Sequence, residues 1–468
     1  MRALFVSLYS DTPHFETELE LIADLLDAGN SVDVLRCTGA LPACLKNPEH
    51  REGWCGLCRS KIERGLATIA SPRLRVFDLA ATVPDPRLPA RFASADELKA
   101  FTLDGLELGR GVYSTMCGRA GKDTHFDTVQ WAPQIRSELE AAYMVLAGVR
   151  AHIAARRPDR IYVFNGRFAS TWPAILAAEE AGLPFFTHER GGSTDRYLLR
   201  ERALPHDIAL NHAEIEAVWA AGEPDREAQA RTWFEERKAG VERSWESFTK
   251  AQSVGKLPDG FDPGAHNIAI FISTLEEYAS IQGWENPLYP DEVVGLARIV
   301  DAVRDKPVRL YVRVHPHMKG IARDTNYQLR EYSRLAAPNL TMIWPESPVH
   351  TYALLEAARV TLTFGSTVGV EACYFGKPSV LAGRALYEQL DCAHVARSHD
   401  DVIRMLLAPP PPKPQLGALK YAYWESHRGT KYTRFRPIGL YDGEWLGRPC
   451  RASLSARLQN IVLSRLGR

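Results

Sequence analysis

Two polar groups follow apolar, strand-like runs in the second half of the chain. His315 ends the run "PVRLYVRVHP", and Gly365, Ser366 and Thr367 end the run "ARVTLTFGS". An imidazole can donate a hydrogen bond to a phosphate oxygen, and hydroxyl groups add further donors. A helix beginning near Thr367 would add backbone N–H groups with partial positive charge. These residues predict a phosphate site; the alternative is that Ser366 and Thr367 only cap the helix.

Other polar residues follow the remaining strand-like runs of this half. The carboxyl ends of parallel strands share one edge of a sheet, and ligands bind outside that edge. The further candidates for nucleotide and donor binding are Arg313, Pro316, Ser273, Thr274, Glu346 and Glu371. Glu371 lies one turn into the expected helix. It would accept hydrogen bonds from ribose hydroxyls or offset the helix dipole.

Three common nucleotide-binding motifs are absent from the chain, which argues against several classes of enzyme. The chain contains no Asp-x-Asp, so the common carboxylate-held Mg²⁺ arrangement for a nucleotide diphosphate is not predicted. Histidine, arginine, hydroxyls and a helix N-terminus would have to neutralise the phosphate, and catalysis would need no cofactor. No P-loop and no G-x-G-x-x-G follows a strand, which argues against a P-loop kinase and a dinucleotide dehydrogenase.

Transfer to a hydroxyl acceptor also needs a general base, and the first half of the chain offers several. The candidates are Asp11, His14 and Glu16 in "SLYSDTPHFETE", and Glu189 in "THERGGS". On the acceptor side we expect Asn165, Arg167 and His188. Glu189 is the first choice as base. The alternative is that it pairs with Arg190 or Arg196 in a structural network.

The segments "VRVHP", "TFGSTVGVEACYFGKPSVLAG" and "IAIFISTLEEYASIQGW" resemble the C-terminal domain of GT-B glycosyltransferases. The likeness is to enzymes of bacterial capsule-polysaccharide biosynthesis and to sialyl- and Kdo-type transferases with a His-Pro motif. CDP-glycerol glycerophosphotransferases share a similar Ser/Thr pair. The resemblance implies that His315, Ser366 and Thr367 hold the donor phosphate. Glu189 is loosely similar to an acidic-Gly motif of that group, from which Arg190 departs.

The resemblance implies a metal-independent glycosyltransferase of bacterial surface-polysaccharide synthesis. Its donor would be a nucleotide-sugar, with a CMP-activated acidic sugar preferred over UDP-sugars and CDP-polyols, and its acceptor a saccharide or a lipid-linked saccharide. The alternatives are a UDP-sugar 2-epimerase, a CDP-polyol phosphotransferase and a non-catalytic protein that binds nucleotide-sugars.

Cys37, Cys44, Cys55 and Cys58 form a separate group in the first half, and the last two make a C-x2-C pair. Four thiolates suit a tetrahedral structural Zn²⁺. The alternative is reduced cysteines that bind no metal. Cys37 and Cys44 are separated by six residues, which is a poor match for the second ligand pair of such a site.

The elements that would position these residues alternate between strand-like and helix-like runs, which is typical of an α/β fold with parallel sheets. The resemblance makes this GT-B, with two Rossmann-like parallel-sheet domains facing each other across a cleft. We expect an acceptor-side domain over residues 1–255 with a Cys-rich loop, and a Pro/Gly-rich linker over 256–267. A nucleotide-sugar domain over 268–407 follows, and then a tail over 408–468 that packs back on the first domain. Residues 209–256 read as helical throughout.

The composition fits a globular protein with no general affinity for nucleic acid. Of the 468 residues, 45% are hydrophobic, and the 57 Lys and Arg balance the 57 Asp and Glu. The apolar stretch at the N-terminus is too short for a signal peptide, and no run is long enough to span a bilayer. We expect a cytoplasmic protein, with the inner face of the membrane as one place of work and peripheral association with it.

Overall fold

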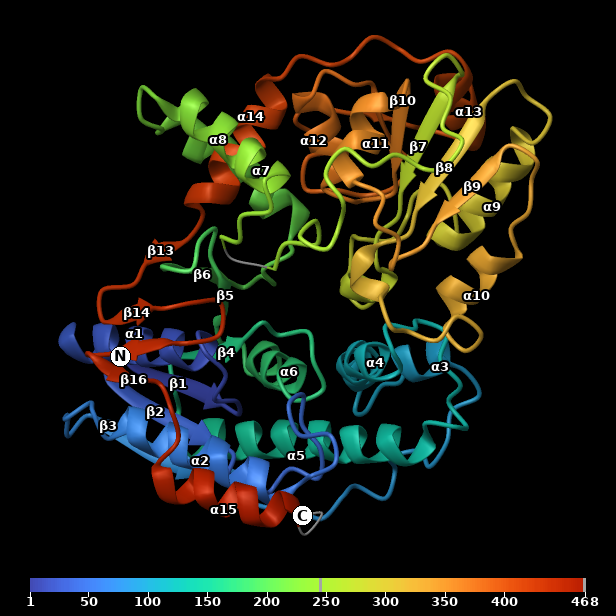
Figure 1. Cartoon of the computed structure of the whole chain (residues 1–468). Coiled ribbons are helices and arrows are strands. Elements are labelled where there is room, and N and C mark those ends of the chain that lie inside the picture. Colours follow the sequence, from blue (N-terminus) through green and yellow to red (C-terminus); the bar gives the residue numbers. More distant parts are fainter. Residues whose placement is uncertain (244–245, 466–468) are drawn as a thin grey trace. The chain divides into compact units, whose positions relative to one another are not determined.

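The computed structural model describes residues 1–243 and 246–465, and these form two units. The first contains residues 1–120, 125–205 and 428–465, and the second contains residues 121–124 and the described part of 206–427. Figure 1 shows the elements of both. The candidate donor-binding residues therefore lie in the second unit, and the candidate bases lie in the first.

The first unit is built on one mixed sheet. Its strands are β1 (Arg2–Ser7), β2 (Ser31–Arg36), β3 (Leu74–Asp78), β4 (Arg160–Phe164), β5 (Phe185–Arg190), β6 (Arg196–Glu201), β13 (Thr430–Lys431), β14 (Phe435–Pro437), β15 (Gly443–Trp445) and β16 (Arg448–Pro449). Its helices are α1 (His14–Asp27), α2 (Glu52–Leu66), α3 (Ala95–Lys99), α4 (Leu108–Arg119), α5 (Ala132–Arg156), α6 (Trp172–Glu180) and α15 (Leu454–Arg465).

Seven of these strands form the mixed sheet, in the order β13-β6-β5-β4-β1-β2-β3, while β14, β15 and β16 form a separate antiparallel sheet. The five strands β5 to β3 are parallel, and β6 and β13 are antiparallel additions. The chain winds outward in one direction from β1 and in the other from β4. Ligand sites of doubly wound sheets lie at the carboxyl ends of such a pair of strands.

The second unit holds a fully parallel sheet. Its strands are β7 (Asn267–Phe271), β8 (Arg309–Arg313), β9 (Leu340–Ile343), β10 (Val360–Thr363), β11 (Ser379–Leu381) and β12 (His394–Val395). Its helices are α7 (Ile208–Ala220), α8 (Arg226–Lys238), α9 (Glu292–Ala302), α10 (Tyr327–Arg334), α11 (Thr351–Ala357), α12 (Val368–Tyr374), α13 (His399–Leu407) and α14 (Leu416–His427), with 3₁₀ turns η1 (Leu275–Glu277) and η2 (Pro316–Met318).

The order β12-β11-β10-β7-β8-β9 repeats the winding of the first sheet, with the change of direction between β7 and β10. Both sides of this sheet are covered by apolar clusters. Ile270, Val312 and Leu362 pack on one side, and Phe271 and Tyr311 pack on the other. Burial on both sides explains why these strands read as continuous apolar runs in the sequence.

The expected α/β class with two Rossmann-like parallel sheets is confirmed. The helical expectation for residues 209–256 was wrong in part, because α8 ends at Lys238 and the described residues after it form turns. Among the described residues, no helix is long and apolar enough to cross a bilayer.

The division of the chain differs from the expected boundaries. Residues 206–255 group with the second unit, so the Pro/Gly-rich stretch 256–267 lies inside that unit. The reason is packing: α7 and α8 bury Trp233 and Phe234 in one cluster with Tyr374 of α12 and Trp424 of α14.

The expected tail over 408–468 is also divided. Helix α14 belongs to the second unit, whereas residues 428–465 belong to the first. There β13 pairs with β6, and the buried Glu20 carboxylate of α1 accepts hydrogen bonds from the backbone N–H groups of Thr433, Arg434 and Phe435.

Candidate functional site

The register of the second sheet brings the predicted strand ends into one row. Phe271 pairs with Arg313 on one side and with Thr363 on the other. Side chains alternate along a strand, so the residues two positions further on lie on the same side of the sheet and at the same edge. These residues are Ser273, His315 and Gly365. The row therefore crosses the β7–β10 position where ligands of doubly wound sheets bind.

His315 is oriented in this row by the turn that follows β8. Its Nδ1 accepts a hydrogen bond of 3.1 Å from the backbone N–H of His317. A neutral imidazole with an accepting Nδ1 carries its proton on Nε2, which makes Nε2 a donor. Burial, together with the neighbouring His317, Lys122 and Arg313, lowers the pKa of His315 to about 3. His315 is therefore a neutral hydrogen-bond donor.

Arg313, two residues earlier on the same side of β8, is a buried cation. Its Nη1 donates to the carbonyl oxygens of Trp344 and Ser347, at 3.4 and 3.2 Å. Its Nε and Nη2 are buried and donate no hydrogen bond. Burial lowers the pKa of Arg313 to about 10, and the attraction of Glu346 opposes this. A buried guanidinium with free N–H groups favours the approach of an anion.

The Gly365-Ser366-Thr367 turn follows β10, which is separated from β8 by β7. A Cβ on Gly365 would lie 2.8 Å from the carbonyl oxygen of Arg384, so only glycine fits there. The Ser366 hydroxyl accepts from the N–H of Val368 at 3.3 Å, as in a helix-capping turn. Helix α12 is only seven residues long. The turn thus supplies backbone and hydroxyl groups at the edge of the sheet, while its helix is short.

Glu371 has a partner within its own unit. Its Oε1 accepts a hydrogen bond of 2.9 Å from Nε of Arg237 on α8, and its side chain is 2% exposed. Arg237 also reaches the Thr367 hydroxyl at 3.4 Å. This ion pair joins α8 to α12, so the structure gives Glu371 a packing role. Its expected contact with a ribose stays a prediction.

Ser273 and Thr274 follow β7; Thr274 is buried, whereas Ser273 is partly exposed with a buried hydroxyl oxygen. The Ser273 hydroxyl makes no hydrogen bond, while its N–H donates to Glu292 Oε2 at 3.2 Å. Burial raises the pKa of Glu292 to about 8. Glu346, after β9, instead pairs with Arg323 at 3.0 Å and is half-exposed. Pro316 begins the turn η2 that fixes His315.

Lys122 was not predicted from the sequence; it lies in the short segment 121–124 of the second unit. Its Nζ lies 3.2 Å from Glu276 Oε1 and 3.0 Å from His317 Nε2. Lys122 is far from His315 along the chain, and no spacing links the two. It adds a second cation near the His-Pro turn.

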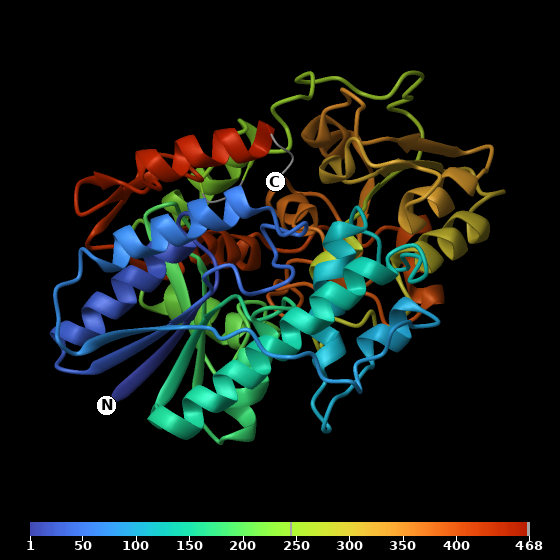
Figure 2. The same cartoon turned by 90° about the horizontal axis from the view of Figure 1, so that it is seen from below.

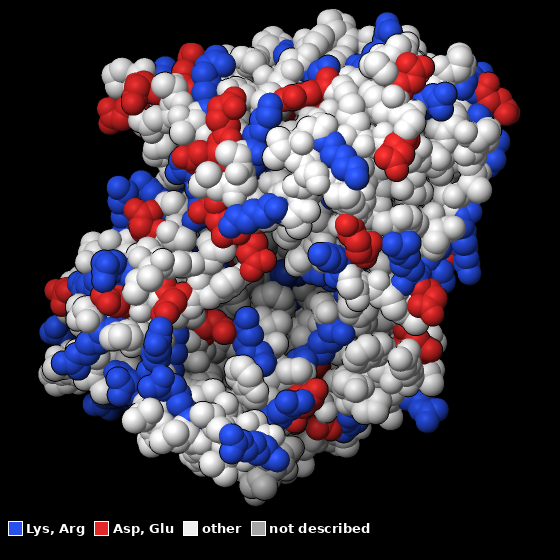
Figure 3. All heavy atoms as spheres, viewed as in Figure 1, with Lys and Arg blue, Asp and Glu red and all other residues white. Residues whose placement is uncertain are grey.

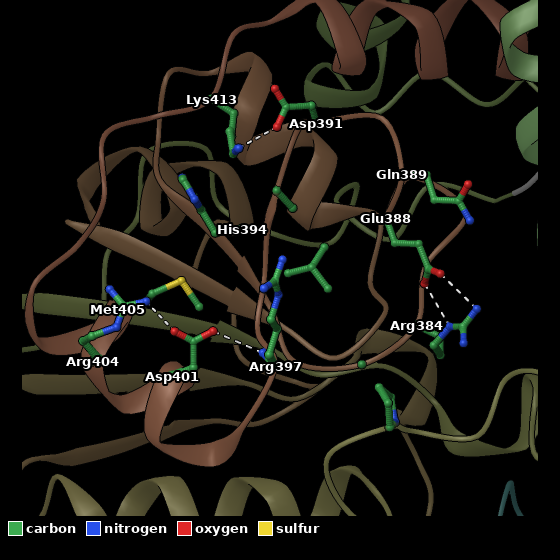
Figure 4. A pocket seen from close by; sticks show the side chains of 14 residues that line it. Arg384, Glu388, Gln389, Asp391, His394, Arg397, Asp401, Arg404, Met405 and Lys413 are labelled. Carbon is green, nitrogen blue, oxygen red and sulfur yellow. Dashed lines mark hydrogen bonds and ion pairs between the residues drawn. The ribbon is translucent and has the colours of Figure 1, made fainter.

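A cavity of about 700 Å³ opens at the carboxyl ends of β11 and β12, as Figure 4 shows. Its charged residues pair with one another: Arg384 with Glu388, Arg404 with Asp401, and Lys413 with Asp391. None of the predicted site residues lines this cavity. It adjoins their row through Arg384, whose carbonyl oxygen closely approaches Gly365.

In the first unit the structure brings together three of the predicted residues. His14 Nδ1 lies 3.6 Å from Glu189 Oε1, and Asn165 Nδ2 donates to Glu189 Oε2 at 2.7 Å. The N–H of Arg190 donates to Oε1 at 2.8 Å. Burial lowers the pKa of His14 to about 3, which the Glu189 charge opposes. This carboxylate–imidazole pair stands after β1, β4 and β5, where the winding of the first sheet changes direction.

The remaining candidates of this unit have other surroundings. Glu16 is 1% exposed and pairs with Lys61 at 3.0 Å, which gives it a structural role rather than access to a substrate. Asp11 lies 3.6 Å from Lys46 and is partly exposed. Arg167 stacks on the ring of Phe168 at 4.5 Å.

His188 is fully buried, and its Nε2 lies 3.4 Å from Glu18 Oε1. It alternates with Glu189 on β5 and so points to the opposite side of the sheet. The structure therefore does not support its expected contact with an acceptor.

The four cysteines near β2 and α2 are all partly buried and reduced. Cys37 Sγ accepts from the N–H of Gly39 at 3.3 Å, and Cys55 Sγ accepts from Asn47 Nδ2 at 3.2 Å. Burial raises the pKa of Cys58 to about 12 and that of Cys44 to about 11. Within the described residues, no group of three or more His, Cys, Asp or Glu is arranged to hold a metal ion. The zinc site stays a prediction.

Comparison with known proteins found no matching family model and no matching curated protein. Among solved structures, the chain is similar to KpsC of Thermosulfurimonas dismutans, a beta Kdo 2,4 transferase (15% identity, TM-score 0.38, 66% of this chain and 88% of that chain). It is also similar to the UDP-GlcNAc 2-epimerase of Neisseria meningitidis bound to UDP-GlcNAc (12%, 0.28, 100% of each chain). A third is CalG4, the calicheamicin glycosyltransferase (12%, 0.29, 91% and 94%). These scores are too low to decide an activity, which must be judged from the residues of the two units.

Proposed function

We propose that the protein is a metal-independent glycosyltransferase that binds a nucleotide-sugar donor on its second unit. The observation that carries this proposal is Arg313 of β8, a buried guanidinium with two nitrogens that donate no hydrogen bond, two residues before His315. A nucleotide phosphate would accept hydrogen bonds from this guanidinium and from Nε2 of His315.

The chemistry of transfer explains why such a site needs fixed positive groups. As the bond between the sugar and the phosphate oxygen breaks, the electron pair stays on the nucleotide, whose phosphate gains negative charge. Donors that are already in place stabilise this charge without rearranging. Arg313 and His315 would act in this way, and the Ser366 and Thr367 hydroxyls would add further donors.

The acceptor hydroxyl must lose a proton when it attacks the sugar carbon. We propose Glu189 as the base, with His14 beside it. Asn165 and the N–H of Arg190 hold the Glu189 carboxylate in one orientation. A positioned carboxylate of this kind accelerates proton transfer by about 10²–10⁴-fold in enzymes. The preferred donor is a CMP-activated acidic sugar, and the product class is a bacterial surface polysaccharide.

The experiment is an assay with purified protein and three donor types: a CMP-activated acidic sugar, UDP-sugars and a CDP-polyol. Each is incubated with and without saccharide acceptors, and released nucleotide and extended acceptor are both quantified. The proposal predicts acceptor-dependent release of CMP that persists in excess EDTA. Turnover of UDP-GlcNAc without an acceptor would identify an epimerase instead. Binding of a nucleotide with no turnover in any mixture would identify a binding protein.

A further inference from the structure

Helix α15 of the first unit carries an apolar stripe that nothing in the described chain covers. Leu454, Leu458, Ile461 and Val462 are each about half exposed or more, and no residue of the helix is buried. Their spacing of i, i+4, i+7 and i+8 puts them on one side of a helix.

The other side of the helix, which is less apolar, packs against α2. Asn460 faces α2 so closely that a Cβ on Gly53 would lie 2.3 Å from its Oδ1, and Ser453 bonds Ser60 at 3.0 Å. Figure 2 shows α15 running alongside α2. Ala456, Asn460 and Leu463 are the less exposed positions of this part of the helix. The more apolar side of α15 is therefore turned to solvent, which is the reverse of ordinary surface-helix packing.

The charged residues of α15 and of the segment just before it are all arginines, although Arg451 pairs with Asp442 at 2.8 Å. Residues 448–465 contain Arg448, Arg451, Arg457 and Arg465 and no Asp or Glu. Arg457 and Arg465 lie within or beside the stripe by helical spacing. Figure 3 shows basic side chains spread over the lower part of the first unit, where α2 and α15 lie. Trp54 of α2, next to the Gly53 that touches Asn460, is 53% exposed.

We propose that α15 is a docking helix for an anionic lipid surface. A helix that lies in a bilayer interface buries Leu, Ile and Trp at the acyl boundary and keeps Arg at the level of the headgroups. A second copy of the chain fits less well, because two such stripes would bring Arg against Arg with no carboxylate between them. The lipid contact is independent of the proposed transfer chemistry.

The test is flotation of the full chain with vesicles of phosphatidylcholine alone or mixed with phosphatidylglycerol. The protein should bind the mixed vesicles, and its tryptophan emission should shift to the blue on binding. High salt should weaken this binding. The double variant Leu458→Gln/Ile461→Gln should bind about tenfold more weakly or worse, because it removes much of the apolar area. Arg457→Gln/Arg465→Gln should lose the preference for phosphatidylglycerol. All the changed side chains are exposed, so circular dichroism should confirm unchanged folding.

Val83→Gln, a change at an exposed apolar residue away from α15, is the matched control and should bind as the unchanged protein does. Equal binding by Leu458→Gln/Ile461→Gln, or no binding to either vesicle type, would overturn the proposal. So would a dimer in vesicle-free solution that this double variant converts to monomer, since the stripe would then contact a second copy. Nucleotide affinity should be the same in all variants, so failure here is distinguishable from failure of the transferase proposal.

Discussion

The proposed donor site can be tested by removing the single hydrogen bond that His315 would donate to the phosphate. His315→Ala should weaken nucleotide binding about tenfold or more, because a hydrogen bond to a charged group contributes about 1.5–3 kcal/mol. His315→Gln should retain part of the affinity, since its amide can donate from nearly the position of Nε2. Isothermal titration calorimetry measures both.

His266→Ala is the matched control for that experiment. His266 lies just before β7, at the opposite end of the strand from Ser273, and its Nε2 bonds the carbonyl oxygen of Leu406 at 2.8 Å. It should leave nucleotide affinity unchanged. Equal affinity of His315→Ala and the unchanged protein would remove His315 from the site.

Glu189 gives a second prediction at this scale, which concerns catalysis rather than donor binding. Glu189→Gln keeps the size of the side chain but cannot accept a proton, so kcat should fall about 10²-fold or more while nucleotide affinity stays the same. The acidic limb of the pH–rate profile should also disappear. A variant with normal kcat, or one whose loss lies only in KM, would assign the base elsewhere, with His14 the next candidate.

At the scale of elements, the strand ends that form the row could be predicted from the sequence, because each depends only on residues close together in the chain. Each parallel strand is an apolar run that ends in polar residues, and the parallel sheet gathers those ends. Lys122 and Arg237 escaped notice because their partners, His317 and Glu371, lie far away along the chain. The sequence placed His188 beside Glu189 on the acceptor side. Neighbouring residues of a strand point to opposite sides of the sheet, and the sequence of one polar segment does not show which side is buried.

The segment after α14 is joined to the first unit by β13–β6 pairing and by the Glu20 carboxylate, and the carboxylate gives an element-scale prediction. Glu20 is 1% exposed and accepts from three consecutive backbone N–H groups of residues 433–435. Glu20→Ala leaves three N–H groups without this acceptor, one of them in buried Phe435, so the free energy of unfolding should fall by about 2–3 kcal/mol. Urea unfolding followed by circular dichroism measures this loss.

Asp27→Ala is the control for Glu20. Asp27 contacts the same Arg434 but is 73% exposed, and exposed ion pairs contribute little. Its effect should lie within about 0.5 kcal/mol. If both variants unfold at the same urea concentration as the unchanged protein, the carboxylate does not anchor the segment.

At the scale of the whole molecule, the two α/β units could be predicted but the path of the chain between them could not. Proline and glycine at 256–267 favoured a linker, whereas α7 and α8 pack on α12 and α14 of the second unit. That packing depends on helices far later in the sequence: α12, between β10 and β11, and α14, after the last strand of the second sheet. Composition at one point of a chain does not report such distant partners.

Acid should destabilise the molecule through histidines whose pKa burial lowers, which are His14, His152, His315, His317, His350 and His399. Burial lowers the pKa of His14 and of His315 to about 3, below the ordinary value of 6.5. The unfolded chain therefore binds more protons between these values, and stability is full above pH 6.5 and falls as the pH drops toward 3. The slope should correspond to about one proton per histidine. Melting temperatures across this range test it, and His315→Gln should flatten the slope.

The central claim is that the second unit binds the phosphate of a nucleotide donor through Arg313 and His315. The most direct measurement is the melting temperature of the protein with CMP, CDP, UDP or GDP in excess, for the unchanged chain and for Arg313→Met. A ligand that binds only the folded protein raises this temperature with its concentration. We predict the largest rise with CMP and its loss in Arg313→Met. No rise with any nucleotide, or the same rise in Arg313→Met, would contradict the claim.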